Sequence, residues 1–272
     1  MNRALILLTN DDGYDSPGLL AAAAVLADLG ELLIAAPLIQ QSGMGRAWPI
    51  YSTGTMNRHQ IGMNGQSHVA YSVDGSPVQA VAHAMLRLTT RRPDLLVSGI
   101  NYGQNLGPAV TSSGTVGAAI EGALSGIPGL AVSLEVDRAY YHSNSDQVEF
   151  GVAAHFVRLF ARRLLAVPLP PDVDLLKVEV PAGATVETPW TVTRQSRKRY
   201  FVSNPIKGAP LGKPVTLDYE LDACSGEPGT DTHALVRDRM VSVTPLSYDL
   251  TSRTDLDDLG TILLNDGNLS AT

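Results

Sequence analysis

Two adjacent carboxylates, Asp11 and Asp12, follow a short apolar run near the start of the chain. The run, residues 4–8, has the composition of a strand buried on both faces, and Thr9-Asn10-Asp11-Asp12-Gly13 comes directly after it. On a continuing strand the two carboxylates would point to opposite faces. Both can face one ion only if the chain leaves strand geometry there, which Gly13 allows. An ordinary Asp-Gly turn after a strand remains the alternative at this point.

Three further polar segments follow predicted strands or open a predicted helix. Gln40-Gln41-Ser42-Gly43 comes after the apolar residues 32–36, and residues 98–107, rich in asparagine and glycine, come after residues 95–97. Ser113-Gly114-Thr115-Val116-Gly117 opens a helix, whose free N–H groups and positive dipole end suit a phosphate. Each segment alone is also compatible with a simple loop or a helix cap.

Together these segments predict a site for a divalent ion and a phosphate. Ligands bind outside the carboxyl ends of strands in open parallel sheets, so the segments should lie at one edge of the sheet. Two carboxylates, a hydroxyl and an amide carbonyl are hard ligands that suit Mg²⁺ or Mn²⁺ rather than zinc. Roughly four protein ligands leave about two positions for water and a phosphoryl oxygen. This arrangement favours a metal-assisted phosphomonoesterase, with the helix start stabilising developing charge.

Alternating strand and helix signals in the first half must position these residues. Apolar strands are expected at residues 4–8, 32–36, 95–97 and 130–132, with helices opening at Pro17-Gly18, at Ser76-Pro77 and at Thr115. The polar, irregular stretch between Trp48 and Tyr71 suggests a hairpin at the sheet edge. This order predicts an α/β fold: a Rossmann-like, mostly parallel sheet with helices on both faces.

The second half is expected to be richer in strands. A long helix at about residues 147–165 precedes candidate strands at residues 175–180, 190–193, 200–202, 215–221 and 240–244. We interpret residues 1–250 as a single α/β domain, with a Rossmann-like core at about 1–135 and a β-rich C-terminal part that carries a protruding hairpin. Residues 251–272 are expected to form a C-terminal arm that packs on the body or on a partner.

Composition limits the function classes. The chain has 272 residues, 44% of them hydrophobic, and a formal net charge of −7, which argues against tight binding to long nucleic acid. No stretch approaches the ~20 apolar residues of a membrane span, and the apolar start is too short for a signal peptide, so we expect a cytoplasmic protein. The single cysteine, Cys224, excludes an internal disulfide and any multi-cysteine metal site.

The chain resembles the SurE family of survival-protein nucleotidases. The resemblance spans roughly residues 4–250 and rests on an ordered set of motifs: residues 6–14 (ILLTNDDGY), 73–77 (VDGSP), 97–107, 113–119 (SGTVGAA), 229–231 (GTD) and 241–246 (VSVTPL). It implies a Rossmann-like domain, cytoplasmic 5'- and 3'-nucleotidase activity and one divalent ion per subunit. It also implies homodimers or homotetramers that exchange C-terminal segments.

The resemblance also implies site residues. The metal ligands of the family fall on Asp11, Asp12, Ser42 and Asn101, and its active-site surroundings fall on Asn10, Gly43, Asn105, Ser113, Gly114 and Thr115. Of these, we expect Asp11, Asp12 and Asn10 to be catalytic, and Gly43, Asn105, Ser113, Gly114 and Thr115 to bind substrate.

Two segments beside the site depart from the common family pattern. Residues 108–112 lack the usual acidic residue and tyrosine, and residues 44–48 also differ, which leaves substrate preference open. Arg46 is either a phosphate or base contact or an ordinary surface arginine. Tyr140, Tyr141 and Asn144 follow the fourth predicted strand, near the expected site; they either stack on a base or are loop residues without a role.

The leading hypothesis is a mononuclear metal phosphomonoesterase that releases phosphate from nucleoside 5'- and 3'-monophosphates. A sensor module that binds nucleotides through the same loops without turnover is the main alternative. A glycosyltransferase with an acidic metal motif ranks lower, because the loop at residues 12–16 shows no sign of a sugar-nucleotide site. We favour water over an aspartate as the nucleophile, since a carboxylate engaged with an ion is a poorer nucleophile.

Overall fold

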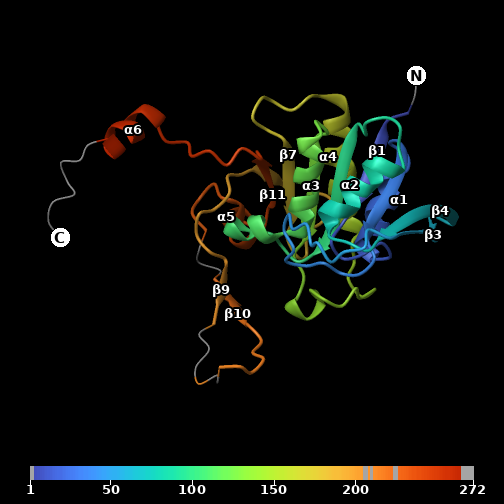
Figure 1. Cartoon of the computed structure of the whole chain (residues 1–272), viewed down its shortest axis with the longest axis horizontal. Helices are drawn as coiled ribbons and strands as arrows, with labels where there is room; N and C mark the ends of the chain where they lie inside the picture. The colour runs from blue at the N-terminus through green and yellow to red at the C-terminus, as the bar shows by residue number, and fades with distance from the viewer. Residues whose placement is uncertain (1–2, 205–207, 209–210, 223–225, 265–272) are drawn as a thin grey trace.

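The central feature of the protein is a mostly parallel sheet covered by helices on both faces (Figure 1). The computed structural model describes residues 3–204, 208, 211–222 and 226–264. In these residues nine strands form one sheet in the order β3-β4-β2-β1-β5-β6-β7-β11-β8. Neighbours from β4 through β7 are parallel, whereas β3 and β11 run antiparallel to β4 and β7. The strands are β1 Leu5–Thr9, β2 Glu31–Pro37, β3 Met56–Met63, β4 Gln66–Val73, β5 Leu95–Tyr102, β6 Gly129–Leu134, β7 Leu175–Val180, β8 Trp190–Val192 and β11 Val241–Leu246.

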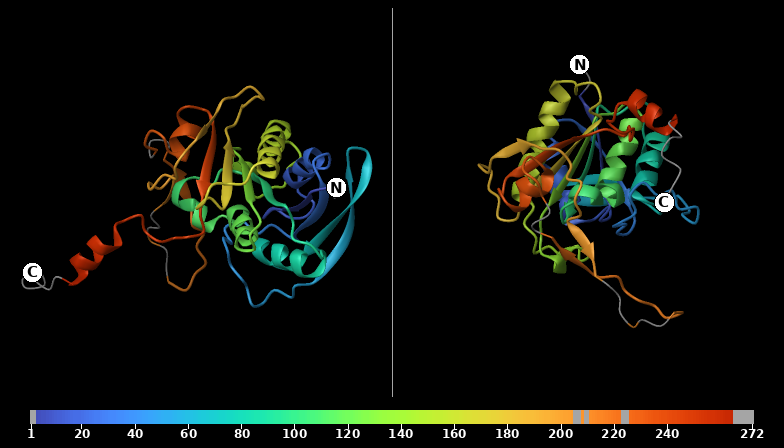
Figure 2. Two further views of the ribbon diagram at one scale, coloured as in Figure 1. Left: turned by 90° about the horizontal axis from the view of Figure 1, so that it is seen from above. Right: turned by 90° about the vertical axis from the view of Figure 1, so that its left-hand side faces the viewer.

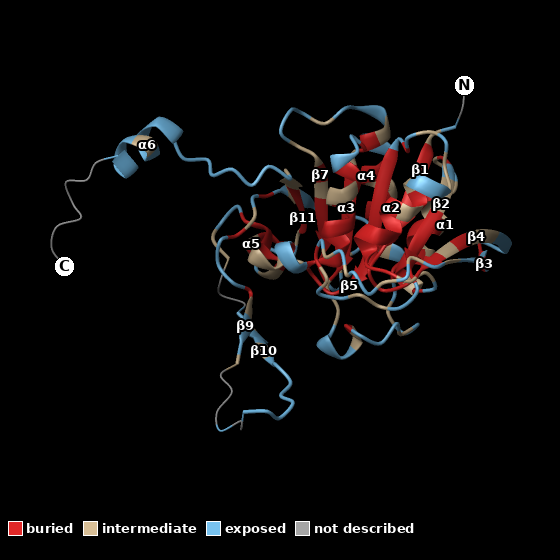
Figure 3. Cartoon of the chain, in the orientation of Figure 1, coloured by how far each residue is buried: buried red, intermediate tan, exposed pale blue. Residues whose placement is uncertain are grey.

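Helices cover the sheet in two pairs that build two separate cores. Helices α1 and α4 pack on one face and α2 and α3 on the other. Their bounds are α1 Pro17–Leu26, α2 Pro77–Arg87, α3 Gly114–Leu124 and α4 Gly151–Ala166. Successive residues of β1 serve opposite cores: Ile6 and Leu8 contact the first, and Leu7 the second. The central strands are therefore buried throughout (Figure 3).

The predicted helix starts at Pro17 and Pro77 are confirmed by their caps. The Ser16 side chain accepts from the N–H of Leu19, and Ser76 forms a reciprocal capping box with Gln79. In both helices proline occupies the first turn, where its missing N–H costs no hydrogen bond. The edge hairpin expected between Trp48 and Tyr71 is also confirmed as β3 and β4.

Several predicted boundaries were wrong. The expected loop at residues 98–107 is strand as far as Tyr102, because β5 continues its pairing with β6 across a register shift between Ser98 and Asn101. The polar residues there belong to the sheet, and strand pairing overrides their loop-like composition. Helix α4 begins at Gly151 rather than near residue 147, and of the candidate strand at 215–221 only Tyr219–Leu221 pairs.

The sheet has a topological switch at β1. The chain moves from β1 to β2 and later to β4 on one side, and then returns to place β5 on the other side. A crevice forms where strand order reverses in this way, outside the carboxyl ends of the strands. The loop after β1 therefore starts beside the last part of β5, since Thr9 pairs with Ser98 and β5 continues to Tyr102.

Two appendages extend from the body. Strands β9 (Phe201–Ser203) and β10 (Tyr219–Leu221) form a separate antiparallel hairpin that protrudes below the sheet in Figure 1. Helix α6 (Leu256–Leu264) stands away from the body in Figure 1 and in the left view of Figure 2, and no residue of this helix is buried. Cys224 and residues 265–272 of the predicted arm lie outside the described residues.

A short helix, α5 (Asp231–Val236), and two 3₁₀ turns, η1 (Gly107–Ser112) and η2 (Arg138–Tyr140), were not predicted from the sequence. No helix among the described residues is long and apolar enough to cross a membrane.

Candidate active site at the carboxyl ends of β1 and β5

The loop that carries Asp11 and Asp12 leaves strand geometry immediately after Thr9, as its sequence predicts. Asn10 holds this loop: its Nδ2 donates to the Gly13 carbonyl at 3.0 Å and to Ser16 Oγ at 2.7 Å, and its Oδ1 accepts from Gly13 N. Gly13 has a φ of +115°, a conformation that a side chain would strain. The Asn10 amide is thus committed to shaping the turn.

Asp11 is held by the first turn of α3. Thr115 Oγ1 donates to Asp11 Oδ1 at 2.6 Å, and the Asp11 carbonyl accepts from Gln41 N at 2.7 Å. The fit against Gly114 is close, because a Cβ at that glycine would lie 2.8 Å from both Cβ and Oδ2 of Asp11. Only glycine lets the helix start approach the carboxylate in this way.

Asp12 is held from the other side. Gln40 Nε2 donates to its Oδ1 at 3.0 Å, and the backbone N–H of Tyr102, at the end of β5, contacts its Oδ2 at 3.4 Å. The Asn144 side chain donates to the Asp12 carbonyl at 3.1 Å. Asp12 therefore lies against the residue next to Asn101, so the ends of β1 and β5 meet at this carboxylate.

Both carboxyl groups are buried, and this controls their electrostatics. Asp11 is 3% exposed and Asp12 1% exposed. Burial raises the pKa of Asp11 to about 6, against the opposing hydrogen bonds from Thr115 and Gly114. Burial and the neighbouring charge of Asp11 raise the pKa of Asp12 well above its usual value. Among the ion pairs of the described residues, none includes either aspartate.

Two asparagines extend the site, Asn101 near the end of β5 and Asn105 in the loop that follows it. Asn101 Nδ2 donates to the Gly103 carbonyl at 2.6 Å, which orients the amide and leaves Oδ1 without a hydrogen bond among the described residues. Asn105 Nδ2 donates to Ser133 Oγ at 3.0 Å, from a loop held against β6 and β7. The Asn101 amide thus keeps its Oδ1 available, and the Asn105 amide lines the pocket from the loop after β5.

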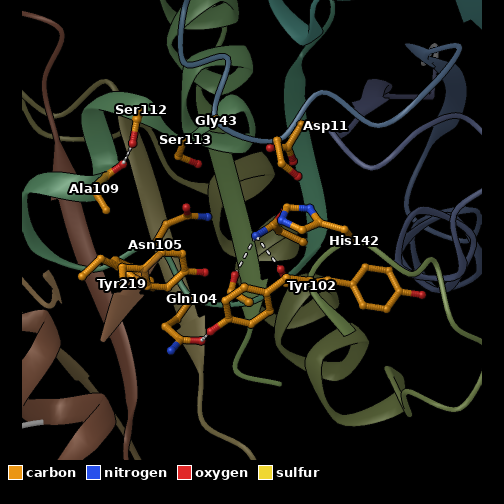
Figure 4. Close-up of a pocket in the computed structure, with 15 residues that line it drawn as sticks. Asp11, Gly43, Tyr102, Gln104, Asn105, Ala109, Ser112, Ser113, His142 and Tyr219 are labelled. Carbon is orange, nitrogen blue, oxygen red and sulfur yellow. Dashed lines mark hydrogen bonds between the residues drawn. The ribbon is translucent and has the colours of Figure 1, made fainter. Parts of the chain in front are cut away.

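A pocket of about 320 Å³ opens between these elements (Figure 4). Predicted site residues that line it are Asp11, Ser42, Gly43, Asn101, Asn105 and Ser113. The predicted residues Asn10, Asp12, Gly114 and Thr115 are buried and do not line it. The structure thus separates the predicted set into residues that face the pocket and residues packed behind them.

Ser113 combines two roles in this pocket. Its Oγ caps α3 by accepting from Val116 N at 3.2 Å, so its hydroxyl proton remains available to an acceptor in the pocket. Ser42 and Gly43 line the pocket from an exposed loop, and Gly43 has a φ of +79° with open space around it.

Other lining residues were missed from the sequence. An aromatic wall formed by Phe201 and Tyr219 bounds the pocket, and Tyr102, Gln104 and His142 also line it. In Figure 4, Tyr219 lies across the pocket from Asp11, whereas His142 lies beside Asp11. Phe201 and Tyr219 come from the β9–β10 hairpin, about a hundred residues from β5 in sequence, and no local pattern links them to the site. Tyr141, considered from the sequence, does line the pocket, whereas Tyr140 bonds Gln147. Arg46 pairs with Glu121 at 2.9 Å and lies outside the lining.

The chain is similar in sequence and in structure to proteins of one family, SurE. The family model described as survival protein SurE matches residues 6–202. The 5'-nucleotidase SurE of Thermococcus gammatolerans is 42% identical over 261 residues, which cover 96% of both chains. That of Archaeoglobus fulgidus is 40% identical over 253 residues, covering 93% of this chain and 94% of the relative. The crystal structure of the SurE protein from Aquifex aeolicus matches with a TM-score of 0.76 at 32% identity, covering 95% of this chain and 99% of that one.

Proposed function

Since the chain belongs to the SurE family, we propose that it is a metal-dependent phosphomonoesterase that hydrolyses nucleoside 5'- and 3'-monophosphates. One observation carries the proposal. Two adjacent buried carboxylates, with no cationic partner among the described residues, lie at the switch point beside a pocket that a capped helix start also reaches.

The donor set fits a divalent ion. Two buried carboxylates without a cation cost free energy, as their raised pKa values indicate, and a bound cation would remove that cost. The described residues contain no group of three or more His, Cys, Asp or Glu side chains suited to a metal, so the ligands here would be oxygens of mixed type. We assign them to Asp11, Asp12, Ser42 and Asn101 through Oδ1. Such a set suits Mg²⁺ or Mn²⁺.

When bound, the ion would polarise the phosphoryl group and lower the pKa of a coordinated water. The chain's own residues then have separable tasks. Ser113 and Asn105 bind phosphoryl oxygens, through the free hydroxyl proton and the side-chain amide. Gly114 and Thr115 act behind them by holding Asp11, and Asn10 acts by holding the loop after β1. We infer that water attacks phosphorus, because Asp11 already accepts from Thr115 and Asp12 from Gln40.

The aromatic wall supports the nucleoside part of the proposal. Aromatic faces bind a planar base by stacking and hydrophobic contact. Tyr219 and Phe201 contact each other edge to face with ring centroids 5.4 Å apart, and the Arg138 guanidinium covers Tyr219 at 4.3 Å. A phosphate bound near Ser113 would leave its nucleoside to extend toward this wall.

The exposed apolar side chains of the C-terminal helix α6 support the proposal that the chain forms a homo-oligomer. The apolar side chains of α6 are between 38% and 83% exposed: Leu256, Leu259, Ile262, Leu263 and Leu264. A helix that leaves such residues uncovered is expected to bury them elsewhere. We propose that residues 1–250 form the catalytic domain and that residues 251–272 pack on a second copy in a homodimer or homotetramer. The proposal also places the enzyme in the cytoplasm.

A phosphate-release assay tests the function. The purified chain should release phosphate from 5'-AMP and 3'-AMP with Mn²⁺ or Mg²⁺ and lose this activity in excess chelator. Asp11→Asn should abolish release, whereas Asp15→Asn, which removes an exposed charge from the same loop, should not. A chain that binds AMP yet never releases phosphate would be a nucleotide sensor instead, and trapping of an aspartyl-phosphate would contradict attack by water.

A further inference from the structure

A cluster of three charged side chains lies fully buried beneath the loop that carries Asn105. Lys177 and Glu179 project from β7 and Asp231 opens α5, and each is 0% exposed. Lys177 Nζ lies 2.8 Å from Asp231 Oδ2 and 3.7 Å from Glu179 Oε1. None of the three lines the pocket.

The cluster binds Asn105 at three points. Lys177 Nζ donates to the Asn105 carbonyl at 2.8 Å, and the Asn105 N–H donates to Glu179 Oε2 at 3.0 Å. The third point is indirect: Asn105 Nδ2 donates to Ser133 Oγ, and Ser133 in turn hydrogen-bonds Glu179. Both backbone groups and the side chain of one pocket residue are therefore held by the same buried charges.

Asp231 hydrogen-bonds the backbone of two neighbouring segments, at Gly107 and at Ser196. Its Oδ2 accepts from Gly107 N at 3.0 Å, and its Oδ1 accepts from Ser196 N at 2.9 Å. Burial would raise the pKa of Asp231, but the Lys177 charge and these hydrogen bonds keep it below its usual value. The segment from Asn105 to Gly107, where the chain leaves β5 and enters η1, is thus held at both ends.

Stability alone does not account for this cluster. Buried charges are costly to desolvate, and well-packed apolar residues often replace them without loss of stability. Here one polar atom of each side chain, Lys177 Nζ, Glu179 Oε2 and Asp231 Oδ2, hydrogen-bonds the backbone of the segment from Asn105 to Gly107. Charged hydrogen bonds fix geometry more strictly than apolar contacts do, because they need short distances and good alignment.

We propose that Lys177, Glu179 and Asp231 are positioning residues that hold Asn105 in the orientation in which it binds the phosphoryl group. They act through Asn105 and do not touch the substrate. The proposal rests on the proposed function, because it assigns Asn105 to the phosphate.

The test compares Lys177→Met with Arg239→Gln. Arg239 pairs with Glu135 at 2.6 Å and also bonds the Ala182 carbonyl, so it bridges the residues that follow β6 and β7 at the same edge of the sheet and makes no hydrogen bond to Asn105. Lys177→Met should weaken binding of inorganic phosphate and raise KM for AMP by about 10- to 100-fold, the cost of misplacing a binding group by ~1 Å. Mn²⁺ affinity should stay within about twofold in both variants, since neither touches the metal ligands.

A double-mutant cycle with Asn105→Ala separates positioning from general destabilisation. If Lys177 acts through Asn105, Lys177→Met should add little to the phosphate Kd of Asn105→Ala. If the Lys177→Met variant does not fold, Ser133→Ala provides the same test, because this smaller change should leave the fold intact. Ser133→Ala should weaken phosphate binding in the wild-type background, and it should leave the phosphate Kd of the Asn105→Ala variant almost unchanged.

Three outcomes would overturn the inference: an unchanged phosphate Kd in both Lys177→Met and Ser133→Ala, additive effects with Asn105→Ala, or an equal loss in Arg239→Gln. Failure of the proposed function is distinguishable from these. A wild-type chain that releases no phosphate from AMP would refute the function, while the phosphate Kd of the variants would still report on the loop.

Discussion

Thr115 Oγ1, in the first turn of α3, donates a 2.6 Å hydrogen bond to Asp11 Oδ1 in the loop after β1. The two residues are 104 positions apart in the chain, and both are buried. The contact directs one carboxylate oxygen toward the helix start. It thereby determines how the rest of the Asp11 carboxylate is presented to the pocket.

Thr115→Val removes this hydrogen bond with little change in shape. Partners that orient a metal ligand typically contribute about 10- to 100-fold to metal affinity, so Mn²⁺ binding measured by titration calorimetry should weaken by that factor. Thr111→Val is the matched control, because Thr111 is exposed and its hydroxyl bonds the Pro108 carbonyl rather than Asp11. Equal Mn²⁺ affinity in wild type and Thr115→Val would argue against a supporting role.

Ser113→Ala tests the hydroxyl that both caps α3 and reaches the pocket. The lost hydrogen bond to a charged phosphate should cost roughly 1–2 kcal/mol, seen as a Kd for inorganic phosphate that is about 5- to 30-fold higher. The lost cap should lower the free energy of unfolding by about 1 kcal/mol. Ser76→Ala removes the cap of α2, together with a hydrogen bond to the Ala47 carbonyl, away from the pocket, so it should lower the stability without raising the phosphate Kd. A phosphate Kd that changes equally in both variants would contradict this assignment.

Glu179 should make the stability of the protein depend on pH. Burial raises its pKa to about 7 from an ordinary value of 4.5, with Lys177 opposing the shift. Between these values the folded state binds more protons than the unfolded state, so the free energy of unfolding should fall as pH rises through this window. The Glu179→Gln variant has no titrating carboxyl group at this position, so its free energy of unfolding should fall less steeply as pH rises.

Thermal unfolding of wild type and Glu179→Gln across the same pH range, without metal, gives the measurement. Asp11 and Asp12 also have raised pKa values, and their contribution is common to both proteins and cancels from the difference. Parallel curves for the two proteins would mean that Glu179 is not the titrating group.

Removal of the C-terminal arm should change the oligomeric state. Deleting the residues after Ser252 removes α6 and its exposed leucines and isoleucine, so the peak on size exclusion should move toward the monomer. Deleting only residues 265–272 keeps α6 and should leave the peak in place. An unshifted peak after the longer deletion would show that the assembly does not depend on this helix.

Some features of the fold and of the site could be predicted because they are encoded within a few neighbouring residues. The apolar strand before Asn10, the turn at Gly13 and the Ser-Pro cap at Ser76 depend only on local burial and backbone preference. The chemical character of the site was also local, since Asp11 and Asp12 are adjacent and offer hard oxygen ligands wherever the loop lies.

Other features depend on packing between distant segments. The extension of β5 to Tyr102 was missed because pairing with β6 outweighs the loop-like composition of residues 98–102. The aromatic wall from Phe201 and Tyr219 has no counterpart in local sequence, and neither has the hold of Lys177 on Asn105, 72 positions away.

By itself the sequence determined the class of fold and the chemistry available at the end of β1. Only the tertiary structure decided which residues face the pocket, such as Ser113, and which support it from behind, such as Thr115 and Lys177. The physical reason is that burial patterns and caps act over a few residues. The placement of a side chain in a site, in contrast, depends on contacts between elements that meet only when the whole sheet has formed.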